Sequence, residues 1–234
     1  MTGWIEQPMA AFDLETTGVD VESDRIVTAC VARLGGISTD ILHALADPGV
    51  DIPQPATDIH GITTEKAKLF GVPAVLVVAE TVDRLGDAWA AGCPVVGFNV
   101  AFDLTMLDRE SRRWCNEPFA IDGPVLDPLV IDRHLDRYRS GPRTLAAVAA
   151  HYGVQAEGAH DAVGDATTAW RVMLAIGRRY PELAAMTLTE LTMAQGIWHA
   201  GWASSFRDYL IQRGRTEDLP DGAWPLRPWT GRAA

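Results

Sequence analysis

The sequence predicts an α/β fold, because strand-like and helix-like patterns occupy successive parts of the chain. Apolar, β-branched runs fill the stretch before residue 47, and helical patterns alternate with short buried runs from residue 74 onward. The chain has 234 residues, of which 47% are apolar, and this is enough for a substantial core. We therefore expect one sizeable α/β domain with extensions.

The N-terminal part predicts a three-stranded antiparallel meander. Its strands are expected over Met9–Glu15, Arg25–Leu34 and Ile37–Ala46. The connections are short, and Gly35 with Gly36 gives a turn signal between the last two strands, which favours antiparallel pairing. Prolines and glycines make residues 47–57 a predicted loop, and Thr63 is expected to begin a helix.

The rest of the chain predicts helices separated by two short buried strands. Helices are expected over Ala74–Ala91, Ala101–Trp114, Asp127–Tyr138, Thr144–Tyr152, His160–Tyr180 and Thr187–Arg213. The two strands are Pro94–Phe98 and Val125–Leu126. Pro73 and Gly92 mark the start and the end of the first helix, and Pro181 stops the long pattern that begins at His160.

The last helical pattern carries an aromatic stripe with a spacing of three or four residues. Its members are Leu191, Ala194, Trp198, Trp202, Phe206 and Tyr209. Such a stripe either packs the helix on the domain or forms a dimer face, and the first interpretation is favoured. From Thr216 onward prolines exclude regular structure, and Trp224 and Trp229 are expected to fix this tail to a surface.

Charge and cysteine content limit the classes of function. The formal net charge of −11 opposes broad, non-specific attraction to nucleic acid or to anionic membranes, although bound divalent cations would reverse the sign locally. The three scattered cysteines predict reduced thiols rather than a disulfide framework or a zinc site. Residues 1–8 are too polar for a signal peptide and no apolar run reaches membrane-spanning length, so we expect a soluble, cytoplasmic protein without membrane partners.

A pair of acids ends the first predicted strand. Residues two apart on a strand point to the same face, so Asp13 and Glu15 should project side by side. Their mutual repulsion favours a hard divalent cation between them, since Mg²⁺ and Mn²⁺ prefer carboxylate oxygens. Gly18 then permits a tight turn. The alternative, two solvated acids at a strand end, stays open for this pattern taken alone.

Two further acidic clusters lie at predicted helix starts. Asn99 can cap a helix whose first turn contains Asp103, an acid that the helix dipole would favour even without a ligand. Asp161 and Asp165 are four residues apart and share one face of the next long helix, directly after His160. Taken alone, this histidine would be a solvated residue near a helix start.

In this order the clusters resemble the DnaQ-like 3′–5′ exonucleases of the DEDD superfamily, in the DEDDh branch. The similarity covers about Met9–Arg179 and rests on F-D-L-E-T-T-G from Phe12, F-N-V-A-F-D from Phe98 and H-D-A-V-G-D from His160. I-H-G-I-T from Ile59 is similar to a stretch of proofreading exonucleases. Residues 53–58 depart from the pattern, because they lack a glutamate that some members carry near there.

The resemblance implies an RNase H-like fold with a mixed five-stranded sheet, three antiparallel strands then parallel ones, flanked by helices. Residues 1–181 would form the exonuclease domain, and residues 182–234 an added helix and tail that pack on it or on a partner. The implied activity is metal-dependent 3′–5′ hydrolysis of mainly single-stranded DNA, with release of nucleoside 5′-monophosphates, in proofreading or repair. The alternatives are an exoribonuclease or oligoribonuclease, and a non-catalytic polymerase-accessory module.

The resemblance also assigns roles to residues. Two Mg²⁺ or Mn²⁺ ions, about 3.5–4 Å apart, would be held by Asp13, Glu15, Asp103 and Asp165. His160 would be the general base on the attacking water, because its ordinary pKa lies near working pH. Asp161 is a rival to Asp165, and the family spacing favours Asp165.

Further residues would serve the substrate and partners. The terminal nucleotide would be bound by Leu14, Thr16, Thr17, His60 and Phe102. For His60, a loop histidine bonded to backbone remains an equal alternative. Several arginines either track phosphates of the strand or are solvated at the surface, and the second is favoured for most of them: Arg109, Arg112, Arg113, Arg133, Arg137, Arg139 and Arg143. A DNA polymerase or a second copy of the chain could dock on the C-terminal region.

Overall fold

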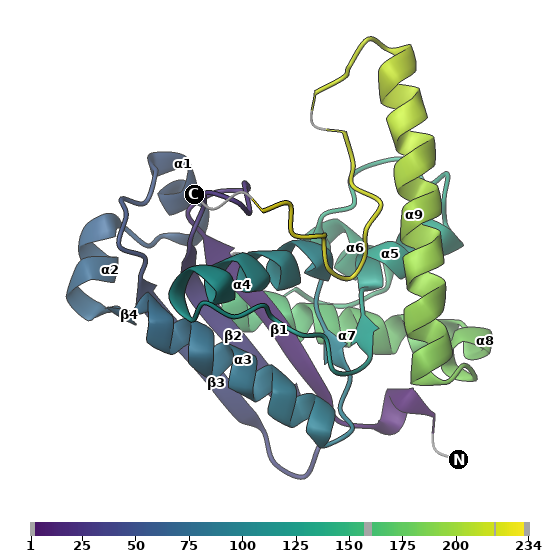
Figure 1. The fold of residues 1–234 in the computed structure, drawn as a ribbon. Helices are drawn as coiled ribbons and strands as arrows, with labels where there is room; N and C mark the ends of the chain where they lie inside the picture. Colours follow the sequence, from purple (N-terminus) through teal and green to yellow (C-terminus); the bar gives the residue numbers. More distant parts are fainter. Residues whose placement is uncertain (1–2, 157–160, 218, 232–234) are drawn as a thin grey trace.

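The structure is a computed structural model that describes residues 3–156, 161–217 and 219–231. A twisted sheet runs through the molecule with helices on both faces (Figure 1). Its strand order is β4-β3-β2-β1-β5-β6. The strands are β1 (Met9–Thr16), β2 (Ile26–Leu34), β3 (Asp40–Asp47), β4 (Val72–Pro73), β5 (Val95–Val96) and β6 (Val125–Leu126).

Strand pairing confirms the predicted mixed sheet. β1, β2 and β3 form an antiparallel meander, and β5 and β6 continue the sheet in parallel on the other side of β1. A sixth strand, β4, adds to the five that were expected and pairs in parallel with β3 at the sheet edge. It has two residues and ends in Pro73, so it gives almost no strand signal.

The helices follow the predicted order with shifted ends. They are α1 (Gln54–His60), α2 (Thr64–Phe70), α3 (Ala74–Ala90), α4 (Val100–Trp114), α5 (Pro128–Leu135), α6 (Leu145–His151), α7 (Ala162–Arg179), α8 (Pro181–Ala184) and α9 (Leu188–Gln212), with a 3₁₀ turn at Trp4–Glu6. α1 begins inside the predicted loop, because Pro55 is accommodated in its first turn. The short α8 was not predicted, and α5 ends at Leu135 rather than Tyr138.

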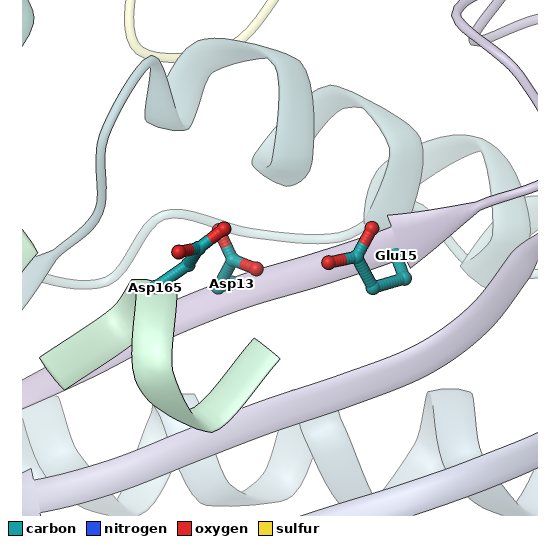
Figure 2. Close-up of side chains that lie close together, drawn as sticks. All are labelled: Asp13, Glu15 and Asp165. Atoms are coloured by element: carbon teal, nitrogen blue, oxygen red, sulfur yellow. The ribbon is translucent and has the colours of Figure 1, made fainter. Parts of the chain in front are cut away.

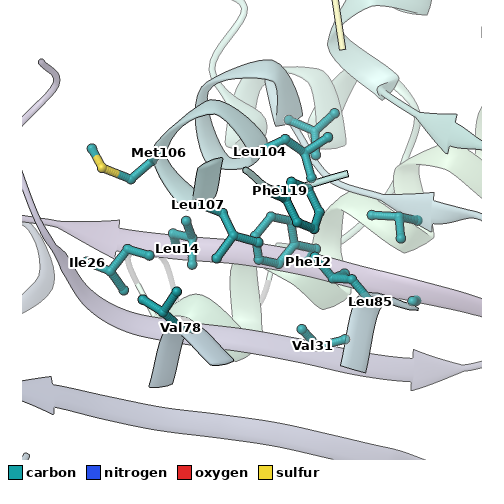
Figure 3. Close-up of a cluster of buried hydrophobic side chains, with 14 of the residues drawn as sticks. Phe12, Leu14, Ile26, Val31, Val78, Leu85, Leu104, Met106, Leu107 and Phe119 are labelled. Carbon is teal, nitrogen blue, oxygen red and sulfur yellow. The ribbon is translucent and has the colours of Figure 1, made fainter. Parts of the chain in front are cut away.

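The core has two layers that meet at β1. Phe12 and Leu14 point to one face, where they pack with Leu85 of α3 and with Leu104 and Leu107 of α4 (Figure 3). The alternate residues of β1 face α7 on the other side, and there Met9 and Ala11 pack in a second cluster with Val172, Met173 and Ile176 of that helix. The same alternation directs Asp13 and Glu15 toward α7.

The C-terminal part packs back onto the domain. α9 lies against α5 and β6, and its buried residues are Leu191, Gln195, His199, Ala203 and Leu210. The tail then turns back along α9 toward α4 (Figure 1). Trp224 packs against the core beside α4, and Trp229 lies over the guanidinium groups of Arg109 and Arg112, 5.2 and 5.1 Å from its ring centre. The expected anchoring of the tail by these two tryptophans is confirmed.

Among the helices of the described residues, none combines the length and the apolar character that crossing a bilayer requires. Cys30, Cys93 and Cys115 are free thiols, as the sequence predicted.

Candidate active site

Three carboxylates meet at the end of β1. Asp13, Glu15 and Asp165 each offer an oxygen, and these oxygens all lie within 4.8 Å of one another (Figure 2). The first two are brought together by the two-residue repeat of β1, as the sequence predicted. The register between β1 and β2 shifts directly after Glu15, where the chain leaves the strand for a turn.

The third carboxylate comes from the start of α7. Asp161 is the N-cap of this helix, and its carboxylate accepts a hydrogen bond from the backbone N–H of Gly164 at 3.3 Å. Capping fixes the first turn, which places Asp165 one turn further on and toward β1 (Figure 2). Of the two rival acids, Asp165 therefore lies in the cluster, whereas Asp161 caps the helix and is exposed.

The fourth predicted acid approaches from the other face of the sheet. Asp103 lies in the first turn of α4, is almost fully buried, and accepts a hydrogen bond from the backbone N–H of Leu14 at 3.2 Å. Its charge is among the causes that raise the pKa of Asp13, which places the two carboxyl groups within electrostatic reach. Asp103 thus lies across β1, within electrostatic reach of Asp13, but it is not one of the three carboxylates that meet within 4.8 Å.

The N-terminus of α4 is held differently from the prediction. Asn99 adopts the left-handed conformation (φ 61°) and its side chain makes no capping hydrogen bond. Instead Asp127, which follows β6, accepts hydrogen bonds from the backbone N–H groups of Asn99 at 3.1 Å and Val100 at 3.0 Å. The predicted Asn99 side-chain cap is therefore wrong, because a carboxylate distant in sequence occupies that position.

Burial and mutual repulsion make the carboxyl groups of the cluster hard to ionise. Burial, and then the charges of Asp103, Glu15 and Asp165, raise the pKa of Asp13 well above its usual value. Burial, followed by the charges of Asp165 and Asp161, raises the pKa of Glu15 to about 7. Carboxylates that repel one another in this way are stabilised by a divalent cation, and their oxygens suit Mg²⁺ or Mn²⁺.

The predicted nucleotide-binding threonines at the β1–β2 turn make hydrogen bonds within that turn. The hydroxyl of Thr16 donates to the carbonyl of Gly18 at 2.7 Å, and that of Thr17 donates to Asp24 at 2.9 Å. A Cβ on Gly18 would lie 2.4 Å from an Asp24 carboxylate oxygen, so a larger residue here would displace that side chain from its bond with Thr17. Leu14 and Phe102 pack in the core cluster beside α4, Leu14 buried and Phe102 half-buried.

His60 makes the expected bond to backbone, and its role in nucleotide binding stays a prediction. Its Nδ1 accepts a hydrogen bond from the backbone N–H of Ile62 at 3.2 Å, although His60 is the last residue of α1 rather than a loop residue. The residue also lines a pocket of about 270 Å³ that borders the acid cluster, with Glu15, Thr28, His43 and Asp161 among the other lining residues. His60 therefore belongs to the wall of a cavity beside the carboxylates.

His160, the predicted general base, lies outside the described residues. The residue that follows it is Asp161, the cap of α7, so the described chain resumes directly beside the acid cluster. The role of His160 as general base stays a prediction from the motif.

Most of the predicted basic residues are committed to internal ion pairs. Arg109, Arg112 and Arg113 bind the buried carboxylates of Asp108 and Glu110 on α4 itself. The pairs of Arg139 and Arg143 with the fully buried Asp132 measure 2.5 and 2.6 Å. Arg133 is largely buried, over the ring of Trp202 at 3.7 Å. Surface solvation was therefore the wrong expectation for these residues, because each has a specific partner inside the fold.

The matched region of the chain fits one known family. The sequence profile of the exonuclease family (RNase_T) matches residues 10–173, which include all the acids described above. The chain belongs to the exonuclease family. The matched region begins in β1 and ends within α7, so α8, α9 and the tail lie beyond it.

Individual relatives agree with this assignment. The exonuclease is 29% identical over 178 residues to the DNA polymerase III subunit epsilon of Aquifex aeolicus, covering 74% of this chain and 81% of that protein. It is 30% identical over 184 residues to a DNA polymerase III subunit epsilon-like protein of Rhodobacter capsulatus, covering 76% of this chain and 24% of that protein. The resemblance to DnaQ-like DEDD 3′–5′ exonucleases is confirmed.

A solved structure shares the fold. E. coli Exonuclease I in complex with a dT13 oligonucleotide superposes with a TM-score of 0.59 at 20% identity, covering 76% of this chain and 42% of that one. The α/β, RNase H-like fold class is thereby confirmed. The exonuclease spans less than half of Exonuclease I and about a quarter of the Rhodobacter protein, so similarity alone does not transfer the activities of those whole proteins.

Proposed function

We propose that this exonuclease removes nucleotides from the 3′ ends of single-stranded DNA and releases nucleoside 5′-monophosphates. The observation that carries the proposal is the convergence of Asp13, Glu15 and Asp165, with Asp103 reaching them across β1. DNA is favoured over RNA because the relatives found by sequence are polymerase III subunits and because the I-H-G-I-T stretch is similar to that of proofreading exonucleases.

The four acids are proposed as ligands of two Mg²⁺ or Mn²⁺ ions. Asp13, Glu15 and Asp165 would hold one ion, and Asp13 with Asp103 the other. When bound, such ions neutralise the scissile phosphate and lower the pKa of a coordinated water. The protein's own part is to fix these oxygens: β1 sets two of them, the cap of α7 sets the third, and the Leu14 amide orients Asp103.

The remaining proposed residues move a proton and place the substrate. His160 would take the proton of the attacking water, and the departing 3′ oxygen of the preceding nucleotide would be protonated from solvent. The pocket beside Glu15, walled by His60, would take part of the terminal nucleotide, together with the backbone of Leu14, Thr16 and Thr17 and the ring of Phe102. The elevated pKa of Glu15 fits a site that is completed by cations.

The domain organisation, the partners and the cellular role of the exonuclease are also proposals. The exonuclease domain would comprise residues 1–181, and residues 182–234 would serve as an extension that packs on it and offers a surface to a DNA polymerase or to a second copy. Work on DNA ends in the cytoplasm, in proofreading or repair, fits this assignment. No described feature favours a membrane partner.

The deciding experiment uses a 5′-labelled DNA strand and an RNA strand of the same sequence, each with Mg²⁺ or Mn²⁺. We expect a ladder that shortens from the 3′ end, nucleoside 5′-monophosphates as products, and faster loss of DNA than of RNA. The Asp13→Ala variant, purified in the same way, controls for contaminating nucleases. Faster loss of RNA would indicate an exoribonuclease instead of a DNA exonuclease. Absence of cleavage with either metal would favour the remaining alternative, a non-catalytic polymerase-accessory module.

A further inference from the structure

We propose that Gln195 of α9 is a positioning residue for the active site. Through Asp127 it holds the N-terminus of α4, and with it Asp103. The inference rests on the proposed role of Asp103 in binding a metal ion. It gives α9, which lies outside the matched family region, a part in the geometry of the site.

The first step is the contact between α9 and the sheet edge. β6 is the last strand of the sheet, so the backbone groups on its outer side need partners from elsewhere. The side-chain amide of Gln195 supplies two: its oxygen accepts from the Asp127 N–H at 2.6 Å, and its nitrogen donates to the Val125 carbonyl at 3.0 Å. A glutamine side chain thus pairs with β6 as a neighbouring strand would.

Neighbouring contacts make this edge well defined. Gln195 is fully buried, and its amide nitrogen also donates to the carbonyl of Leu191 one turn earlier, at 3.1 Å. Thr192 pairs with both backbone groups of Val125, at 3.3 and 3.2 Å. Because buried polar groups without partners are costly, the orientation of the glutamine amide is fixed by these bonds.

The second step runs from Asp127 to α4. Its buried carboxylate accepts from the N–H groups of Asn99, Val100 and Leu129, so it joins the starts of α4 and α5. Asn99 has a left-handed backbone, which is uncommon for residues other than glycine, although asparagine adopts it more readily than most. Asp127 therefore determines how α4 begins, one turn before Asp103.

The third step is from the start of α4 to the acid. Asp103 lies in the first turn of the helix and reaches β1 through its bond with the Leu14 N–H. A shift of the first turn would move this carboxylate relative to Asp13. Displacement of a functional group by about 1 Å can cost about 10²-fold in rate, so a bond far from the reacting atoms can affect turnover.

The test replaces Gln195 with leucine, which keeps the volume and removes both bonds to β6. Leu191→Ala is the matched control, because Leu191 is equally buried on α9 and does not bond to Asp127 through its side chain. Three quantities are measured on the whole chain: amide hydrogen exchange over residues 99–103, Mn²⁺ binding by calorimetry without substrate, and turnover of single-stranded DNA at saturating Mn²⁺.

We expect Gln195→Leu to speed exchange over residues 99–103 by about tenfold or more, to weaken the second Mn²⁺ binding event, and to lower turnover by about 10–10²-fold. Leu191→Ala should lower the melting temperature and leave these three readings as in the wild type. Wild-type exchange and Mn²⁺ binding in Gln195→Leu would overturn the inference, as would equal changes in both variants.

A second variant covers the case in which Gln195→Leu does not fold. Asp127→Asn keeps the shape of the side chain and replaces one acceptor oxygen by a donor group, so the bonds to Asn99 and Val100 cannot both persist. It should reproduce the changes in exchange and Mn²⁺ binding, and its failure to do so would contradict the proposal. If the wild type releases no nucleotides, the proposed function fails separately, since exchange and Mn²⁺ binding need no substrate.

Discussion

The acids of the site are held in two different ways. Asp13 and Glu15 sit on one strand, where the two-residue repeat and the antiparallel pairing with β2 place them together. Asp103 is held from a distance, by Leu14 on β1 and by the chain Gln195–Asp127 that ends at the start of its own helix. Local geometry therefore builds the first half of the site, and tertiary contacts build the second half.

The largest expected effect concerns the three carboxylates that meet at the end of β1. Replacing Asp13 or Asp165 by alanine should abolish hydrolysis, with a loss of about 10³-fold or more, because several kcal/mol of charge stabilisation by bound ions would be lost. Release of nucleotides from a labelled strand measures it. Asp161→Asn is the matched control on α7: asparagine is also a good N-cap, so Asp165 should stay in place and activity should remain within a few-fold.

His160 comes next in expected effect. His160→Ala should lower turnover by about 10²–10⁴-fold while Mn²⁺ still binds, because general-base catalysis accounts for rate enhancements of this size. Single-turnover kinetics, together with calorimetry of Mn²⁺ binding, measure the two properties separately. A variant with the wild-type rate would show that another group activates the water.

Protonation of Glu15 links metal binding to pH. Its folded-state pKa of about 7 lies above the usual 4.5, so without metal the folded state loses stability as pH rises from about 4.5 to 7. Cations must displace protons from such carboxylates, and they relieve the repulsion that grows with pH. The rise in melting temperature on adding Mn²⁺ should therefore be larger at pH 8 than at pH 6. An equal rise at both values would argue against a proton-linked site.

The smallest expected effect concerns the tail that packs on α4. Trp229→Ala removes the ring that lies over Arg109 and Arg112, and it should cost about 0.5–2 kcal/mol of unfolding free energy. Turnover should stay within a few-fold, since Trp229 contacts Arg109 and Arg112 rather than Asp103. Thermal unfolding and DNA degradation measure the two effects. A large loss of turnover would show that the tail also helps to hold α4 in position.

The same contrast explains what could be predicted from the sequence. The meander and the strand acids follow from local pattern, and the choice of Asp165 follows from the family spacing, whereas the capping role of Asp161 was not predicted. Asn99 was expected to cap α4 because its own side chain is a good acceptor, and nothing local indicates that a carboxylate 28 residues later would do so.

The arginines show the same limit. Arg139 and Arg143 flank the segment Ser140-Gly141-Pro142, whose composition predicts an exposed turn, but both bind the buried Asp132 of α5. The pairing partners are visible only after α5 and the chain that follows it have folded together. Asp127 has a faint local signal, an acid between a buried strand and a proline, which predicts a helix cap and not a link to Asp103.

The central claim is that distant carboxylates meet around divalent cations. Crystals grown with Mn²⁺ and a nucleoside 5′-monophosphate, measured by anomalous diffraction at the manganese edge, test it most directly. The account predicts one peak bound by Asp13, Glu15 and Asp165 and a second shared by Asp13 and Asp103, directly or through water. Manganese absent from these carboxylates, with the nucleotide bound elsewhere, would contradict it.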